Sequence, residues 1–258
     1  MKRVALIVTV AFALGVALVA PRVMAQKDDS SNNGFPKVIT PDSLYGGKSY
    51  SEWSAQWWQW TYSIPVANHP LFDNGDCSVG QSGPVWFLGG KLCQANGTAC
   101  NGSVTRTCNI PHDTALFVPV AVTVEDSALE ELNNNGCGNI PPLITGTITQ
   151  LYQCAASLDD YLSAGGKVVV IVDGFVLPQR KNHFRVQSPV FELTLPADNA
   201  LNATGEGPFS AGTYSPAVAD GTFLFLAPLS PGRHTLQFVD TFPNFTSSSD
   251  TYYLTVAK

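Results

Sequence analysis

A short glycine-rich segment in the N-terminal half contains a serine that could act as a nucleophile. Residues 80–84 read GQSGP and resemble the G-x-S-x-G turn that presents the serine of many hydrolases, but Pro84 stands where the last glycine is needed. A catalytic serine also needs a histidine and an acid in defined positions. The nearest upstream histidine, His69, precedes Ser82 closely and lacks the sequence context of a protease histidine. We therefore interpret Ser82 as a turn residue.

The histidines and acidic residues suggest a second kind of chemistry, in acid–base catalysis or metal binding. His69 could pair with Asp73 or Asp76, and the segment DNGD at 73–76 offers oxygen ligands of the type that calcium prefers. The pattern lacks the rest of a calcium loop, so turn residues that cap backbone amides are the favoured interpretation. The four histidines are His69, His112, His183 and His234. No H-x-H or H-E-x-x-H spacing connects them, so we expect neither a metal nor any other cofactor.

Four of the five tryptophans lie in the segment SEWSAQWWQW, residues 51–60. When successive residues are placed about 100° apart, as in a helix, most of the large side chains of this region fall in one narrow stripe. Such a stripe predicts a helix docked on a core. Trp58 lies about 120° from the centre of that stripe. The stripe consists of Tyr50, Trp53, Trp57, Trp60 and Ile64.

Trp58 allows two interpretations. It could pack under a second covering element, or it could form a flat platform for a sugar ring or another planar ligand. In the second case, nearby carboxylate and amide groups would supply directional hydrogen bonds. The candidate ligand-binding residues are therefore Trp58, Glu52, Gln56, Gln59 and His69.

Six cysteines, an even number, predict three disulfides if the protein is exported. Fifteen pairings are formally possible for six cysteines. Short loops favour Cys93–Cys100 and Cys137–Cys154, and Cys77–Cys108 would then enclose the first of these. No C-x-x-C pair occurs, which argues against zinc.

The N-terminus has the pattern of a secretory signal peptide. Lys2 and Arg3 precede an uncharged apolar run from Val4 to Ala20, and small residues at 23 and 25 predict cleavage after Ala25. An uncleaved membrane anchor is the alternative. We expect a signal peptide at 1–25, a flexible leader at 26–48 and one domain at 49–258, in a secreted or periplasmic protein.

The charge of the mature chain excludes some classes of partner. Cleavage would leave 11 basic and 20 acidic residues, a net charge of −9. An acidic surface does not attract phosphate backbones or acidic lipids, so we expect neither nucleic acid nor a membrane as partner after cleavage. A glycan or a cell-envelope component fits better. The sequence alone indicates no oligomeric state.

The elements that would position these residues are mostly strands. After Gly166, short apolar runs alternate with turn residues, and KVVVIVDGFVL places Asp-Gly between two such runs, which predicts a hairpin. The run TFLFL indicates a strand buried on both faces, and TITQLYQCAASLDDYLSAGG has helical periodicity. We expect a mainly β fold, a β-sandwich of jelly-roll or immunoglobulin-like type, with two or three helices packed on one side.

Four segments resemble those of a group of secreted bacterial proteins of unassigned function: SEWSAQWWQW, HPLFDNGDCSVGQSGPVWFLGG, RTCNIPHDTALFVPV and SPVFELTLP. The C-terminal stretch LSPGRHTLQFVD…DTYYLTV loosely resembles the closing strands of bacterial immunoglobulin-like modules. The resemblance to the secreted group implies export and a compact fold, and it implies no particular activity.

The sequence thus predicts an exported, non-catalytic binding or structural module, with carbohydrate as the candidate ligand. The alternative is a secreted hydrolase of glycosides or esters. Such an enzyme would use carboxylates or His69 in a cleft beside the tryptophan-rich helix.

Overall fold

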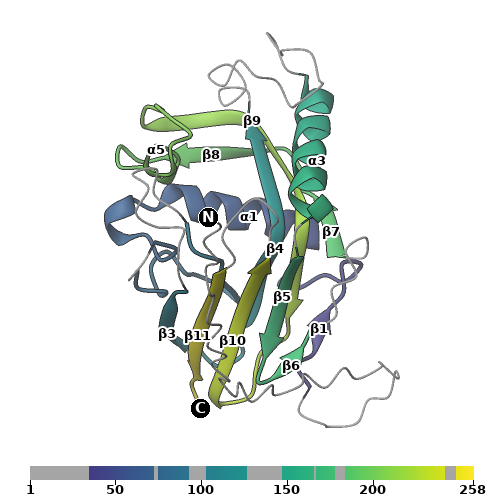
Figure 1. Cartoon of the computed structure of the whole chain (residues 1–258), viewed down its shortest axis with the longest axis vertical. Helices are drawn as coiled ribbons and strands as arrows, with labels where there is room; N and C mark the ends of the chain where they lie inside the picture. Colours follow the sequence, from purple (N-terminus) through teal and green to yellow (C-terminus); the bar gives the residue numbers. More distant parts are fainter. Residues whose placement is uncertain are drawn as a thin grey trace, which may run out of the picture.

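The computed structural model describes residues 35–72, 75–92, 103–126, 147–165, 167–177, 184–241 and 248–258. Within these ranges the chain is mainly β, with eleven strands in two sheets and three α-helices (Figure 1). The predicted β-sandwich with helices packed against it is confirmed. In the described part of the chain, no helix has the length and hydropathy needed to cross a bilayer.

The first sheet, sheet A, is organised around one long strand, β9 (Gly212–Leu226). One edge of β9 pairs with β4, and β2 lies parallel to β4 beyond it. The other edge of β9 pairs in turn with β8, β7 and β1, all antiparallel. The bounds of the partners are β1 Val38–Ile39, β2 Val85–Phe87, β4 Ala115–Asp126, β7 Arg185–Gln187 and β8 Phe191–Leu195.

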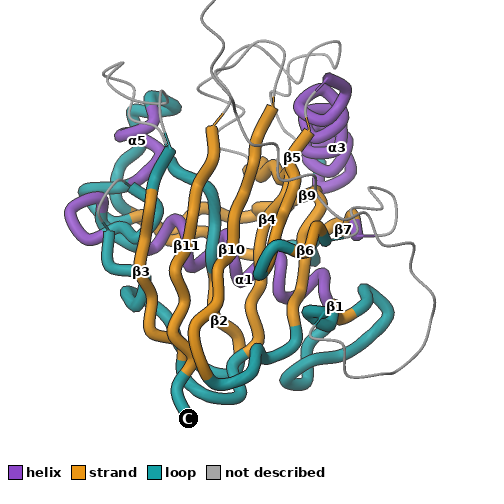
Figure 2. The backbone as a smooth tube through the Cα atoms, turned by 60° about the horizontal axis from the view of Figure 1, so that its bottom comes forward, coloured by secondary structure: helices purple, strands orange, loops and turns teal. Residues whose placement is uncertain are grey.

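The second sheet, sheet B, has the order β3-β11-β10-β5-β6 (Figure 2). Only β3 pairs in parallel, with β11, and the other neighbours are antiparallel. Asp173 and Gly174 both have positive φ in the turn between β5 and β6, so the predicted Asp-Gly hairpin is confirmed. The strands are β3 Thr105–Ile110, β5 Lys167–Val172, β6 Phe175–Val176, β10 Gly232–Thr241 and β11 Ser248–Val256.

Both faces of β9 are buried along its second half. Phe223 and Phe225 point toward helix α1, where their rings contact Trp57 and Tyr50. Leu224 has the opposite parity and is also buried, in a single core cluster that includes side chains of both sheets. The run TFLFL is therefore a strand covered on both faces, as its continuous hydrophobicity predicts.

The helices pack mainly against sheet A. Helix α1 (Tyr50–Ser63) contacts β4, β7, β8 and β9, and helix α3 (Ile148–Gly165) contacts β4 and β9. The short helix α5 (Ala200–Thr204) lies against α1. A one-turn 3₁₀ helix, Val66–Asn68, follows α1. Sheet B consequently keeps one face that none of these helices covers.

Candidate functional site

The tryptophan stripe of α1 is part of the core. Trp53, Trp57 and Trp60 are all buried, and each indole N–H donates to a backbone carbonyl. The acceptors are the carbonyls of Tyr45, Leu88 and Val79, at 2.9, 2.9 and 3.2 Å. The predicted role of these three residues as core anchors is confirmed.

Trp58 is also buried, with 7% of its surface exposed. Its ring meets the ring of Trp57 edge-on at 4.8 Å and lies 5.3 Å from the ring of Tyr62. A sugar platform needs an open aromatic face, and Trp58 does not present one. The packing interpretation therefore fits this residue. Within the described residues its indole nitrogen has no hydrogen-bond partner.

Glu52 belongs to the start of α1. Its carboxylate accepts from the backbone N–H of Ser49 at 2.7 Å and from the Ser49 hydroxyl at 2.8 Å, and the Ser49 hydroxyl accepts from the backbone N–H of Glu52. This reciprocal pair is a capping box. The backbone and then the side-chain hydrogen bond from Ser49 hold the pKa of Glu52 below its usual value. Its carboxylate therefore serves helix initiation.

His69 is a structural residue, with only 1% of its surface exposed. Leu71 N–H donates to Nδ1 at 3.1 Å, so Nε2 carries the proton and donates to the carbonyl of Thr61 at 2.6 Å. Burial lowers the pKa of His69, the hydrogen bond to Thr61 opposes that shift, and the charge of Arg106 adds to it. Both ring nitrogens are occupied, which leaves none for a ligand or a substrate.

Of the two acidic residues in the segment DNGD, the one that the structure describes, Asp76, caps a turn as predicted. Asp76 accepts from the backbone N–H of Ser78 at 2.9 Å and from its hydroxyl at 2.8 Å, as an Asx-turn requires. Asp73 lies outside the described residues. In the described ranges no group of three or more His, Cys, Asp or Glu side chains could hold a metal ion.

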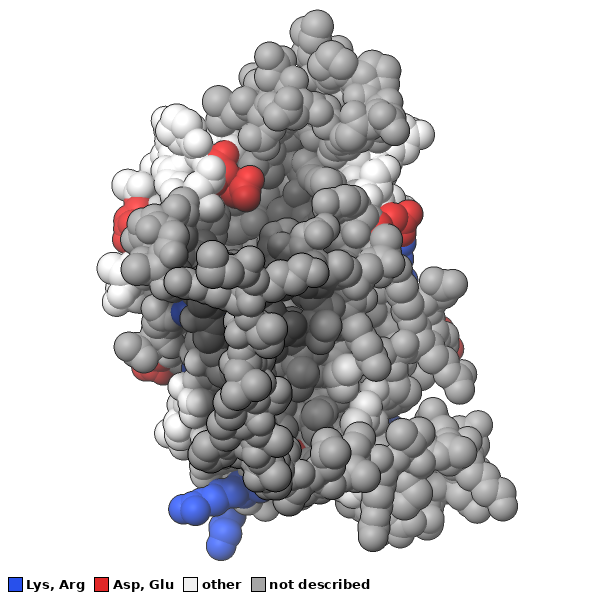
Figure 3. Space-filling view, in the orientation of Figure 1, with Lys and Arg blue, Asp and Glu red and all other residues white. Residues whose placement is uncertain are grey.

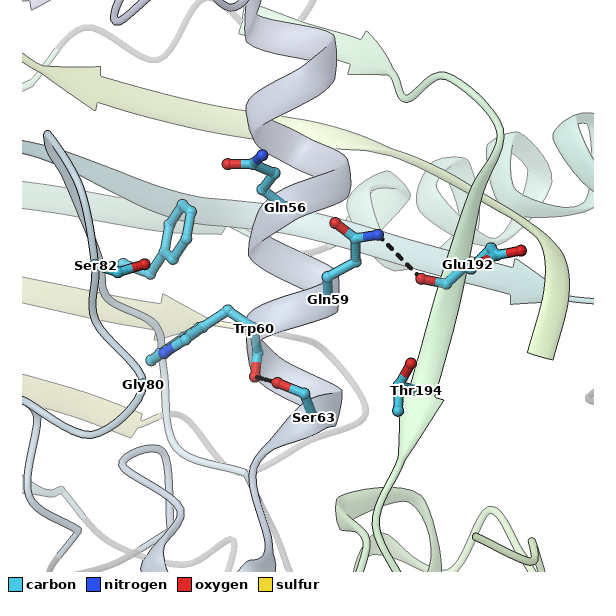
Figure 4. Close-up of a pocket in the computed structure, with 9 residues that line it drawn as sticks. Gln56, Gln59, Trp60, Ser63, Gly80, Ser82, Glu192 and Thr194 are labelled. Carbon is cyan, nitrogen blue, oxygen red and sulfur yellow. Dashed lines mark hydrogen bonds between the residues drawn. The ribbon is translucent and has the colours of Figure 1, made fainter. Parts of the chain in front are cut away.

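A groove of about 430 Å³ opens beside α1, between that helix, the loop before β2 and strand β8 (Figure 4). Gln56 and Gln59 enter it from α1, and the Gln59 amide donates to the carbonyl of Glu192 at 3.1 Å. The structure thus brings two of the five candidate residues into one site and leaves Trp58, Glu52 and His69 outside it. The lining residues are Gln56, Gln59, Trp60, Ser63, Gly80, Ser82, Phe87, Glu192 and Thr194.

The loop that forms one wall of the groove is held in place from within. The Gln81 amide donates to the carbonyls of Cys77 and Phe87 and accepts from the backbone N–H of Phe87. Gly80 has positive φ and lies so close to Trp60 that an added Cβ would stand 3.0 Å from the indole nitrogen. Ser82 bridges to Val85 across a turn, which confirms that it is a turn residue.

The disulfide Cys77–Cys108 ties the same loop to β3, with its Cα atoms 5.8 Å apart, and confirms one predicted pair. Cys154 is also disulfide-bonded. Cys93, Cys100 and Cys137 lie outside these residues, so the pairs Cys93–Cys100 and Cys137–Cys154 remain predictions.

The groove is equipped for hydrogen bonding. Its amides both donate and accept, and its hydroxyls do the same. Among the described residues that line it, Glu192 is the only one with an ionisable side chain. Glu192 and Thr194 are the lining residues that sequence reasoning missed. The alternation in FELTL places both on the face of β8 away from the buried Phe191, Leu193 and Leu195, but it does not say what lies opposite them.

Comparisons with known proteins give no family. No family model and no curated protein matches the chain. One similar solved structure is described as PbICP-C in complex with falcipain-2, at 10% identity and a TM-score of 0.25, covering 67% of this chain and 99% of that one. Another is the cysteine protease inhibitor EhICP2 from Entamoeba histolytica, at 9% identity and a TM-score of 0.20, covering 67% and 95%. At these scores the likeness supports no argument about this chain.

Proposed function

We propose that this protein is an exported, non-catalytic binding module that holds a carbohydrate in the groove between α1 and β8. The observation that carries the proposal is the polar lining of that groove, which combines two amides, three hydroxyls and one carboxylate with the edges of two buried aromatic rings. Sugars present many hydroxyls that each need a directional partner. A few placed polar groups on a largely preformed wall supply such partners.

The walls of the groove are rigid, which favours binding. Trp60 is fixed by its bond to Val79, and the opposite loop is tied by Gln81 and by the Cys77–Cys108 disulfide. A preformed site loses little side-chain and loop freedom when a ligand enters, so more of the interaction energy remains for affinity. The disulfide also fits export, because such bonds persist in oxidising compartments.

The hydrolase alternative finds less support in this groove. Hydrolysis of a glycoside by the usual route requires two carboxyl groups that flank the bond, and ester hydrolysis by a serine requires a base. The described lining residues contribute Glu192 alone among ionisable groups, and His69 is buried with both nitrogens occupied. We therefore propose binding as the function and do not propose catalysis.

A glycan array probed with the purified protein tests the proposal, followed by titration of the strongest hits. The double variant Gln56→Ala with Gln59→Ala should weaken those hits about tenfold or more, since two ligand hydrogen bonds are lost. Its Tm should stay within a few degrees of wild type, because both amides lie on the outer side of α1. Gln187→Ala, an exposed amide on β7, is the matched control and should bind normally. An array without hits, or hits that the double variant binds as wild type does, would refute the proposal.

A further inference from the structure

The face of sheet B that none of the described helices covers carries a regular array of polar side chains, which we call the β11 face. Alternate residues of β3, β10 and β11 point into the core, and those between them point outward. Figure 2 shows these three strands side by side. The β11 face consists of Thr105, Thr107, Asn109, Thr251, Tyr253, Thr255, Arg233, Thr235 and Gln237.

The strand register arranges these residues in three rows. Thr235 pairs with Tyr253, which pairs with Thr107, so the tyrosine stands at the centre with a threonine on each side. Arg233 and Thr255 form the next row, one residue pair closer to the C-terminal end of β11. Neighbouring strands lie about 4.8 Å apart and alternate residues about 6.7 Å apart along a strand. Several of these side chains can therefore contact one small ligand.

Tyr253 is the large side chain that this face presents to solvent, with 51% of its surface exposed. On the same strand the neighbouring Tyr252 and Leu254 are buried, so the exposure of Tyr253 follows from the pleat. A hollow of about 410 Å³ lies against it, within the size range of small-molecule sites. Its lining is Thr107, Asp173, Arg233, His234, Thr235, Tyr253, Leu254 and Thr255.

Arg233 is the charged residue of the β11 face. Its side chain is exposed and makes no hydrogen bond or ion pair within the described residues. The nearby carboxylate of Asp173 is already engaged, because one oxygen lies 2.6 Å from Nδ1 of His234 and the other accepts from the backbone N–H of Thr235 at 2.8 Å. The other nitrogen of His234 faces the carbonyl of Ser230 at 2.7 Å.

Among the described residues, basic side chains are exposed at several places on this acidic protein, and one of these places is the end of the β11 face. In Figure 3 smaller blue areas lie along both sides of the molecule, and the largest blue area lies at its lower end, near the C-terminus marked in Figure 1. Strand β10 begins and β11 ends there, since Gly232 pairs with Val256. An anionic group that approaches this end of the β11 face meets the exposed guanidinium of Arg233.

We propose that the β11 face binds an oligosaccharide that carries a carboxylate. One sugar ring stacks on Tyr253, the hydroxyls of Thr107, Thr235 and Thr255 bond to ring substituents, and Arg233 holds the carboxylate through its planar fork. Arg233 lies diagonally across from Tyr253, a separation that long side chains on adjacent strands can bridge. This site lies on the opposite sheet from the α1 groove and does not depend on the function proposed for that groove.

Isothermal titration with a hexamer of galacturonic acid tests the proposal, and its methyl ester provides the matched uncharged ligand. The acid should bind more tightly than the ester, and this difference should shrink at high salt. Arg233→Gln should weaken binding of the acid about 10- to 100-fold and leave binding of the ester unchanged. Tyr253→Ala should weaken both ligands about tenfold, and Tyr253→Phe should keep most of the affinity.

Two control variants distinguish binding at the β11 face from general charge attraction and from binding in the α1 groove. Lys37→Gln removes an exposed cation that lies off the β11 face and should bind as wild type does. The Gln56→Ala with Gln59→Ala protein should also keep its affinity for the acid, so failure of the α1 groove leaves this result intact. If wild type fails to bind the acid at millimolar concentration, or if Arg233→Gln and Tyr253→Ala bind normally, the proposal is wrong.

Discussion

Two adjacent tryptophans of α1 should respond differently to the same substitution. Trp57 donates to the buried carbonyl of Leu88, whereas the N–H of Trp58 is buried without a partner among the described residues. Replacement by phenylalanine removes the N–H in both cases and shrinks the ring by a similar amount. In Trp57→Phe the carbonyl of Leu88 loses its donor, which costs about 1–3 kcal/mol beyond the lost packing. In Trp58→Phe an unsatisfied buried group disappears, which offsets part of the lost packing.

We therefore expect unfolding free energies to fall by about 2–4 kcal/mol for Trp57→Phe and by about 0–1 kcal/mol for Trp58→Phe. Urea unfolding of both variants with the disulfides intact measures the difference, and equal m-values show that the unfolded states are comparable. Trp57→Ala should cost about 3–5 kcal/mol, and Gln56→Ala on the outer side of the helix less than about 0.5 kcal/mol. Equal costs for the two phenylalanine variants would refute the hydrogen-bond argument. A cost below about 1 kcal/mol for Trp57→Ala would refute the burial of the stripe.

Two further predictions concern the loop and the turn beside the groove. Replacing Cys77 and Cys108 together by serine should lower the unfolding free energy by about 3–4 kcal/mol, since the bond joins residues separated by 31 positions. Urea unfolding measures this loss, and a value below about 1 kcal/mol would contradict the prediction. Because burial holds the pKa of His69 below its unfolded value, the unfolded chain takes up a proton first as the pH falls below about 6.5. Stability should therefore decrease over that range in wild type and decrease less in His69→Gln, and an unchanged slope in urea unfolding at several pH values would count against the assignment.

The features that sequence reasoning predicted correctly are those encoded by local periodicity. The stripe of α1 repeats at three- and four-residue steps, so Trp53, Trp57 and Trp60 had to share one side of a helix. The Asp173–Gly174 turn is specified by two residues that tolerate positive φ. The continuous run TFLFL could only be a strand covered on both faces or a buried helix segment, and its short length favours the strand.

The site was predicted only in part, because it is assembled by contacts between distant segments. The polar side of α1 yields Gln56 and Gln59, but Glu192 and Thr194 join them from β8, far along the chain. Local spacing contains no information about which strand lies opposite a helix face. The same limit explains why His69 was wrongly chosen as a candidate. Its polar ring made it a candidate ligand-binding residue. Its burial, however, depends on Thr61, Leu71 and Arg106, which the fold brings together around it.

Aromatic content by itself therefore says little about where this protein binds. The rings of α1 that dominate the sequence are buried, and three of their indole nitrogens are bonded to backbone carbonyls, so they serve to dock the helix. Phe35 is exposed as well, but its ring meets Phe175 edge-on at 5.4 Å. Tyr253 differs from both, since it stands among hydroxyls on a paired strand whose inward residues fix its backbone. A ring held open on a rigid sheet loses little freedom when a ligand stacks on it, which is why we expect Tyr253, and not Trp58, to contact a sugar.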